Sequence, residues 1–358
     1  MSEKKTHFYT SVSSWLLVGW LFFSAACSSD TPTPEYQFPE PPKENVEKPR
    51  YIWIDAAANF PDFANSKENI ARDLKLAKEA GFTDIVVDVR PSSGDILYKS
   101  SVPGVDEVRW LGAWVNGKFS RVDRTATWDY LQAFIEESRK LELKVHAGFN
   151  TMVGGESDGL GPQGILYRDP TKKSWATSEN LATGITNTLD NGGGTKFFNP
   201  ANEEVHTYLC DLLKDLAKYD LDGIILDRGR YGGMKSDFSE LTRKKFESYL
   251  GNVKLSNYPE DILPKGASMQ QVMAMKTYPP YFTKWLEFRA KMIYDFMSKA
   301  RTAVKSVNSN IQFGVYVGGW YSTYYEVGVN WASNRYNSST TYGWATAKYK
   351  DYGYAALM

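Results

Sequence analysis

Residues 197–231, FFNPANEEVHTYLCDLLKDLAKYDLDGIILDRGRY, have the pattern of a helix that leads into a short buried strand. The helix is predicted to begin after Asn199-Pro200, and Glu203 and Glu204 in its first turn suit the positive end of the helix dipole. Apolar side chains then recur every three or four residues, which provides one face for burial. These positions are Val205, Tyr208, Leu209, Leu212, Leu213 and Leu216.

The strand that follows is apolar throughout, at residues 224–226, and Asp222-Gly223 form the turn before it. A strand without a polar face belongs in a parallel sheet that is covered by helices. Polar side chains come at its carboxyl end, which in such proteins is the edge where chemistry is built. They are Asp227, Arg228, Arg230 and Tyr231.

The same alternation of strand and helix continues on both sides of this stretch. Asn116-Gly117 predicts a hairpin turn within an insertion at residues 100–126. Residues 151–196 are rich in Gly and Thr without clear periodicity, and we expect them to form a long functional or mobile loop. Strands are expected at residues 51–55, 84–90, 143–149 and 311–317, and helices at residues 66–80, 127–141, 239–250 and 281–307.

Repeated strand–helix units predict a parallel α/β sheet, and the long segments after the strands favour a (β/α)8 TIM barrel over a doubly wound sheet. Residues 51–358 have the length of one such domain. Five complete units are visible, and a helix at residues 341–350 and a strand at residues 354–358 begin a sixth. The barrel is therefore expected to be incomplete at the carboxyl terminus, with about six strands, either because the reading frame is truncated or because the sheet stays open.

The amino-terminal segment predicts a secreted, lipid-anchored protein. A basic start precedes an apolar run at residues 16–26, which is too short for a permanent span. The run ends in Ser24-Ala25-Ala26-Cys27, which resembles a bacterial lipobox, so residues 1–27 are predicted to be a signal peptide whose cleavage leaves a lipid on Cys27. Residues 28–50 are rich in Pro and Glu and suit an extended tether in the cell envelope. The alternative is ordinary secretion with an incidental Cys27.

Composition and missing motifs narrow the possible functions. The chain has 42 Lys+Arg and 42 Asp+Glu, and this balance argues against a nucleic-acid partner. Neither a dinucleotide-binding glycine motif nor a P-loop occurs, so no nucleotide cofactor is expected. Only His146 and His206 remain beyond the signal peptide, which argues against a metal cluster. Aromatic residues make up 15% of the chain, and their rings suit sugar faces as well as a large core.

The residues after each predicted strand combine carboxylate, guanidinium, amide and aromatic groups. In a barrel these positions converge on one mouth, and such a set suits hydrogen bonding to sugar hydroxyls and hydrolysis by paired carboxyl groups. Structural roles are the alternatives, such as an ion pair of Asp227 with Arg90 or Arg230. The candidate residues are Asp55, Asp88, Arg90, Asp95, His146, Asn150, Asn199, Asp227, Arg230, Tyr231, Trp320 and Glu326.

Three stretches resemble the glycosyl-hydrolase-like 10 family, which is distantly related to the α-amylase superfamily of barrel glycosidases. Val89-Arg90-Pro91 with Gly94-Asp95-Ile96-Leu97-Tyr98 resembles the family's V-R-P and G-D-A-L-Y. Val145-His146-Ala147-Gly148-Phe149-Asn150 resembles V-H-A-W-F-N. Asn199-Pro200, Val205 and residues 219–227 resemble L-N-P, V and Y-D-V-D-G-I-H-F-D-D-Y. The three stretches occur in the family's order between residues 51 and 358.

The resemblance implies a barrel glycosidase in which Asp227, after the fourth strand, is the nucleophile or transition-state stabiliser. By the same analogy an acid after the fifth strand is the proton donor, and Glu326 is the first acid available there. Two positions depart from the family pattern. Arg228 replaces a second Asp, which removes a carboxylate from the site, and Gly148 replaces a Trp.

Three functions therefore remain open. The first is a carbohydrate-cleaving enzyme in which Asp227 acts with a second carboxyl group about 5–5.5 Å away for retention or about 6.5–9.5 Å away for inversion. In that case Arg90, His146 and Asn150 are expected to hold sugar hydroxyls. The second is a glycan-binding lipoprotein without catalytic activity. The third is an envelope scaffold with a degenerate site.

Overall fold

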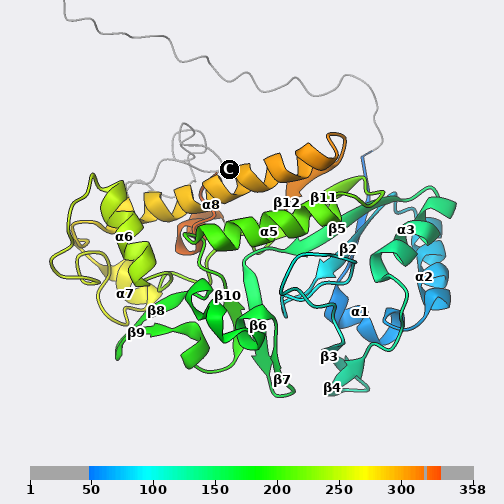
Figure 1. Ribbon diagram of the computed structural model, residues 1–358, viewed down its shortest axis with the longest axis horizontal. Coiled ribbons are helices and arrows are strands. Elements are labelled where there is room, and N and C mark those ends of the chain that lie inside the picture. The colour runs from blue at the N-terminus through cyan, green and yellow to red at the C-terminus, as the bar shows by residue number, and fades with distance from the viewer. Residues whose placement is uncertain (1–47, 318–320, 332–358) are drawn as a thin grey trace, which may run out of the picture. The chain divides into compact units, whose positions relative to one another are not determined.

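The computed structural model describes residues 48–317 and 321–331, in which five parallel strands form one sheet (Figure 1). The strands lie side by side in the order in which they occur along the chain, as they do in a barrel. This confirms the parallel α/β prediction. Among the described residues the sheet does not close into a barrel, since β1 and β12 form its two edges. The strands are β1 Tyr51–Ile54, β2 Asp84–Arg90, β5 Lys144–Asn150, β11 Gly223–Asp227 and β12 Gln312–Val315.

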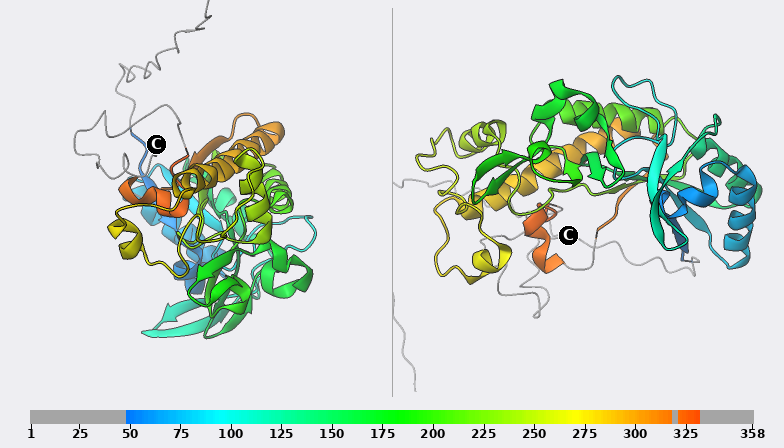
Figure 2. Two further views of the ribbon diagram at one scale, coloured as in Figure 1. Left: turned by 90° about the vertical axis from the view of Figure 1, so that its left-hand side faces the viewer. Right: turned by 90° about the horizontal axis from the view of Figure 1, so that it is seen from below.

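Helices cover one face of this sheet, and their apolar sides form the main core with the strand residues that point outward. Ser66 and Asn202 accept hydrogen bonds from backbone amides and cap α2 and α5. Helices α5 and α8 run side by side in Figures 1 and 2. The helices are α1 Ala56–Phe63, α2 Lys67–Glu79, α3 Tyr130–Lys140, α5 Glu203–Leu216 and α8 Phe282–Val307.

The opposite face of the sheet carries polar, aromatic and glycine residues. Parallel pairing places Asn150 of β5 beside Asp227 of β11, and Gly148 beside Ile225. A side chain at Gly148 would meet the ring of Trp53, whose Cζ2 atom lies 3.0 Å from the position of a Cβ. Trp53 on β1 therefore occupies the space beside the glycine that replaces the family's Trp. Its ring also contacts Tyr316, just after β12, with 5.2 Å between ring centroids.

The segment between β5 and α5 was predicted to be a long loop, and that prediction is wrong. It contains a three-stranded antiparallel sheet, a two-stranded hairpin and short helices. The strands have only three to six residues, which is too short for alternation to stand out in the sequence. The elements are β6 Val153–Asp158, β7 Gly161–Gln163, α4 Ile165–Arg168, η1 Pro170–Trp175, β8 Ser178–Leu181, β9 Gly184–Asn187, η2 Thr188–Asp190 and β10 Gly194–Phe197.

The predicted hairpin at Asn116-Gly117 is confirmed by β3 Trp110–Val115 and β4 Lys118–Asp123. Both turn residues have positive φ, 51° and 77°, as tight hairpin turns require. A second, smaller core lies under α6 Glu240–Tyr249, α7 Met269–Ala274 and the first half of α8.

Several predicted features lie outside the described residues. They are the signal peptide, Cys27, the tether up to residue 47, Trp320, the helix at residues 341–350 and the strand at residues 354–358. Within residues 48–317 and 321–331, no helix combines the length and the apolar character needed to cross a membrane.

Candidate functional site

Asp227 lies at the carboxyl end of β11, where a neighbouring segment holds the backbone in place. The amide of Thr151 donates to the carbonyl of Asp227 at 2.7 Å, and the amide of Met152 donates to the carbonyl of Arg228 at 3.1 Å. The partly buried carboxylate accepts a hydrogen bond from the Arg228 amide at 2.6 Å. In the described part of the chain it forms no ion pair with Arg90 or Arg230, which the structural alternative required.

Arg228 has a left-handed backbone conformation with φ of 47°. This region costs a residue with a side chain roughly 1–2 kcal/mol, so it persists only where the surroundings impose it. Here the carbonyl of Arg228 accepts from the amides of Met152 and Arg230, at 3.1 and 2.8 Å. These hydrogen bonds hold the strained backbone of Arg228 in place, and the backbone conformation in turn fixes the direction of its side chain.

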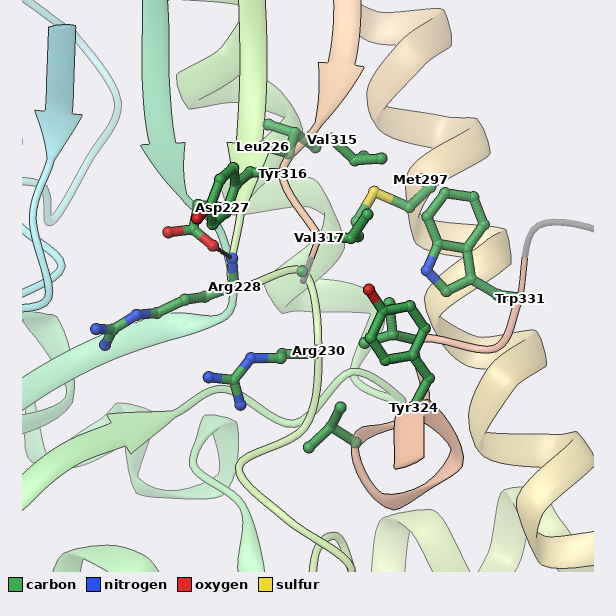
Figure 3. Close-up of a pocket in the computed structure, with 13 residues that line it drawn as sticks. Leu226, Asp227, Arg228, Arg230, Met297, Val315, Tyr316, Val317, Tyr324 and Trp331 are labelled. Carbon is green, nitrogen blue, oxygen red and sulfur yellow. Dashed lines mark hydrogen bonds between the residues drawn. The ribbon is translucent and has the colours of Figure 1, made fainter. Parts of the chain in front are cut away.

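A cavity of about 410 Å³ opens beside Asp227 (Figure 3). Its polar wall is formed by Asp227, the last residue of β11, and by Arg228 and Arg230 in the turn that follows. The facing apolar wall comes from α8, β12 and the segment that contains η3 Tyr321–Val327. A polar group opposite aromatic and aliphatic side chains is the usual composition of a small-molecule site. The apolar wall consists of Met297, Val315, Val317, Tyr324, Val327, Val329 and Trp331, and Tyr316 lies next to Asp227.

Asp88 and Asp55 lie on the same edge of the sheet as Asp227. Burial, followed by the negative charges of Asp55 and Asp227, raises the pKa of Asp88 from 3.8 to about 7. Asp88 accepts a hydrogen bond from the Arg90 amide at 3.2 Å and lies 3.4 Å from the side-chain nitrogen of Asn150. Asp55 is exposed and caps α1 through the Ala58 amide at 2.8 Å. The structure thus brings together Asp55, Asp88, Asn150 and Asp227.

Arg90 is fully buried, and its guanidinium packs into the corner of the chain that follows β5. Its guanidinium donates to the carbonyls of Asn150, Thr151 at 3.2 Å and Val153 at 2.6 Å. It also lies over the rings of Phe149 and Phe198, 5.0 and 5.9 Å from their centroids. Every one of these contacts is structural, so no face of the guanidinium is directed toward the cavity.

Asp95, Asn199 and Tyr231 also have structural surroundings. Asp95 forms an ion pair with Arg168, in which one guanidinium nitrogen donates to both carboxylate oxygens at 2.7 and 2.9 Å. The side-chain nitrogen of Asn199 donates to Asp237 at 2.7 Å within a buried polar cluster. Tyr231 is fully buried below the Arg289 guanidinium, which lies 4.3 Å from its ring centroid.

His146 lies inside a strand, as the predicted bounds of 143–149 already imply, and not at the carboxyl end, with whose residues it was grouped. It is the third of seven residues in β5, and its Nε2 atom lies 2.7 Å from a carboxylate oxygen of Asp84. Both side chains are buried, and the ring of Tyr51 packs on the imidazole at 5.2 Å. At roughly 3.3 Å per residue, His146 lies about 13 Å from the carboxyl end of the strand.

Glu326 lies in η3 but is not among the residues that line the cavity. Its backbone carbonyl accepts from Arg289 at 3.1 Å, and partial burial raises the pKa of its carboxyl group. Within the described ranges, no group of three or more His, Cys, Asp and Glu side chains is arranged to hold a metal ion.

The sequence model of the glycosyl hydrolase-like 10 family matches residues 48–351. The chain belongs to this family. A relative described as an S-layer-related protein of Niallia circulans is 32% identical over 295 residues, which cover 80% of this chain. The chain spans only 18% of that relative's length.

Solved glycosidase structures are more distant from this family member. A match to α-L-fucosidase isoenzyme 2 of Paenibacillus thiaminolyticus has a TM-score of 0.46 and 15% identity, covering 76% of this chain and 33% of that one. A match to the catalytic domain of the β-amylase of Paenibacillus polymyxa has a TM-score of 0.47 and 12% identity, covering 86% of this chain and 75% of that one.

Sequence reasoning missed most of the cavity's apolar wall. Tyr316, Tyr324 and Trp331 line the cavity, whereas only their neighbours Trp320 and Glu326 were expected there. Tyr316 had a usable signal, because a residue two positions after Gly314 shares its face of the sheet. Nothing in the sequence indicated that Met297 lines a cavity, since its spacing on α8 is that of a core residue. Arg228 was placed at the carboxyl end of the strand and noted as a departure from the family pattern, but it was not among the candidate residues.

Proposed function

We propose that this member of the glycosyl hydrolase-like 10 family cleaves a glycosidic bond in a polysaccharide or oligosaccharide, with Asp227 as the nucleophile or stabiliser of the oxocarbenium-like transition state. The observation that carries the proposal is the placement of Asp227, which lines the cavity on a rigid strand end while a second, buried carboxyl group lies on the same edge. Glycosidases divide the work between two such groups in different environments.

We propose that Asp88 is the proton donor of this pair, in place of Glu326, which was expected in that role from the sequence. A proton donor must still hold its proton near neutral pH, and the raised pKa of Asp88 allows this. Asn150 lies between the two acids in the sheet, since it pairs with Asp227 and its amide lies near Asp88. The sugar would rest against Tyr316, Tyr324 and Trp331.

The raised pKa of Asp88 has a consequence for stability. The folded protein keeps a proton that the unfolded chain releases above about pH 4. This contribution to stability is fully present below about pH 4 and is lost as the pH rises toward 7. We therefore expect Asp88→Asn to flatten the fall in melting temperature between pH 4 and pH 7. Arg90 and Tyr130 also interact electrostatically with this carboxyl group, and both keep their charge states in that range.

Thermal melts of the two proteins at several pH values test this expectation. Asp158→Asn, at a partly exposed position at the end of β6, is the matched control and should leave the pH dependence unchanged. Parallel pH profiles for wild type and Asp88→Asn would contradict the assignment. In a hydrolase that uses Asp88 as its acid, kcat/KM should also decline as the pH passes 7.

One observation favours a second function, glycan binding without catalysis. Among the described residues that line the cavity, Asp227 is the only one with a carboxylate, and Arg228 stands where the family pattern has a second Asp. A screen of the purified protein against a panel of polysaccharides, scored for both binding and release of reducing ends, separates the two functions. Binding with no release by any member of the panel would support the binding protein and reject the hydrolase.

We propose in addition that the protein is held in the bacterial cell envelope by a lipid on Cys27, and that its parallel strands belong to a (β/α)8 barrel of which this chain holds about six strands. The lipobox-like Ser24-Ala25-Ala26-Cys27 supports the anchor, and five parallel strands in sequential order support the barrel.

Replacing the lipidation site tests the anchor. We expect Cys27→Ser to move the protein from the membrane fraction to the soluble fraction or to leave it unprocessed, because no lipid can then be attached. Cys210→Ser, in α5, is the matched control and should fractionate as wild type does. A Cys27→Ser protein that stays in the membrane fraction at its mature size would contradict the anchor.

A further inference from the structure

Two guanidinium groups line the cavity without a carboxylate partner. Arg228 and Arg230 lie in its polar wall, and their side chains extend in the same direction in Figure 3. Arg230 donates to the carbonyl of Tyr231 at 3.2 Å and lies over the ring of Phe197 at 5.5 Å. In the described part of the chain, neither arginine forms an ion pair.

This arrangement is unfavourable in the absence of a ligand. Burial and then the positive charge of Arg228 lower the pKa of Arg230, and Asp227 opposes this only in part. The polar wall therefore contains two positive groups against one negative group, and both arginines are partly buried. Arg228 adds its left-handed backbone, a strain that is typically found at functional sites.

A negatively charged ligand would relieve this repulsion. A guanidinium group presents paired N–H donors in a plane, which match the oxygens of a carboxylate or sulfate group. The aromatic side chains Tyr324 and Trp331 line the same cavity and suit the flat face of a sugar ring. In Figure 3 the two guanidinium groups extend away from these rings, on the side of Asp227. The combination fits a sugar that carries an acidic substituent better than it fits a neutral one.

We propose that Arg228 and Arg230 form a subsite for the carboxylate or sulfate group of an acidic sugar, placed beside Asp227 at the carboxyl end of β11. This rests on the proposed function as a glycan-acting protein and names its substrate class. Arg228 stands where the family pattern has a second Asp. This replacement changes a site with two acidic side chains into one that attracts a negatively charged ligand.

Binding of four monosaccharides to the full-length protein tests the subsite. The acidic probes are glucuronate and glucose 6-sulfate. Their neutral counterparts are the methyl ester of glucuronic acid and glucose, respectively. We expect at least one acidic probe to bind roughly tenfold more tightly than its neutral counterpart, as a charge-assisted hydrogen bond implies. The acidic probe that binds identifies the substituent. Equal binding of acidic and neutral probes, or binding of none, overturns the proposal.

Matched variants assign the effect to the two arginines. Arg228→Gln and Arg230→Gln should each remove most of the preference for the acidic probe. Arg121→Gln, on the exposed hairpin strand β4, should leave it intact. Asp227→Asn should bind the acidic probe at least as tightly as wild type, because it removes the competing negative charge. An acidic preference that survives in both Arg228→Gln and Arg230→Gln overturns the subsite.

The outcome is separable from that of the proposed hydrolysis. Selective binding of an acidic probe by a protein that releases no sugar from acidic polysaccharides keeps the subsite and rejects the hydrolase. Cleavage of a neutral polysaccharide, with no preference among the four probes, keeps the hydrolase and rejects the subsite.

Discussion

Asp227→Asn is expected to lower kcat by about 10²–10³-fold on the polysaccharide that the protein cleaves, while KM changes much less. The substitution removes a negative charge that acts mainly on the transition state, and losses of this size follow removal of one such electrostatic group. The amide keeps the shape of the side chain and the acceptor for the Arg228 amide. The melting temperature should therefore stay within a few degrees of that of wild type.

Asp95→Asn provides the opposite control. Asp95 is buried and forms an ion pair with Arg168, away from the cavity, so its replacement should lower the melting temperature and leave activity per folded molecule nearly intact. Both quantities are measured on the same preparations. A destabilised but fully active Asp227→Asn would mean that Asp227 is a structural residue, and the catalytic role would then have to be abandoned.

The sequence was sufficient for the elements whose signal is local. The apolar run before Asp227 predicted a buried parallel strand, and the periodicity of residues 203–216 predicted α5 with its buried face. Because the carboxyl ends of parallel strands share one edge, the same reasoning placed Asp55, Asp88, Asn150 and Asp227 together. The structure agrees on all four positions.

The residues that sequence reasoning misplaced depend on contacts between distant segments. His146 lies inside both the predicted strand at residues 143–149 and the observed β5, so grouping it with the strand-end residues was wrong. Its ring instead contacts Asp84 and Tyr51, which come from other parts of the chain. Arg90 ends a strand as predicted, yet a register shift between Asp88 and Arg90 turns it toward the corner after β5. No local pattern shows which carbonyls a long side chain will reach.

Arg90→Met is expected to lower the free energy of unfolding by about 3 kcal/mol or more. Methionine fills much of the space between Phe149 and Phe198 but cannot donate hydrogen bonds. The carbonyls of Thr151 and Val153 would then stay buried without their donor, and each unpaired group of this kind costs roughly 1–3 kcal/mol. Denaturant unfolding measures the change, and Arg72→Met, at an exposed position on α2, should shift stability by less than about 1 kcal/mol.

The same experiment separates a structural Arg90 from the sugar-binding Arg90 that the sequence predicted. The carbonyls that Arg90 holds belong to the corner whose amides, at Thr151 and Met152, fix the backbone of Asp227 and Arg228. A structural role therefore predicts loss of stability together with lower kcat, since the corner that positions Asp227 loosens. A direct sugar contact predicts a raised KM with unchanged stability. Because every Arg90 contact is structural, the first outcome is expected, and a raised KM in a fully stable Arg90→Met would restore the ligand role.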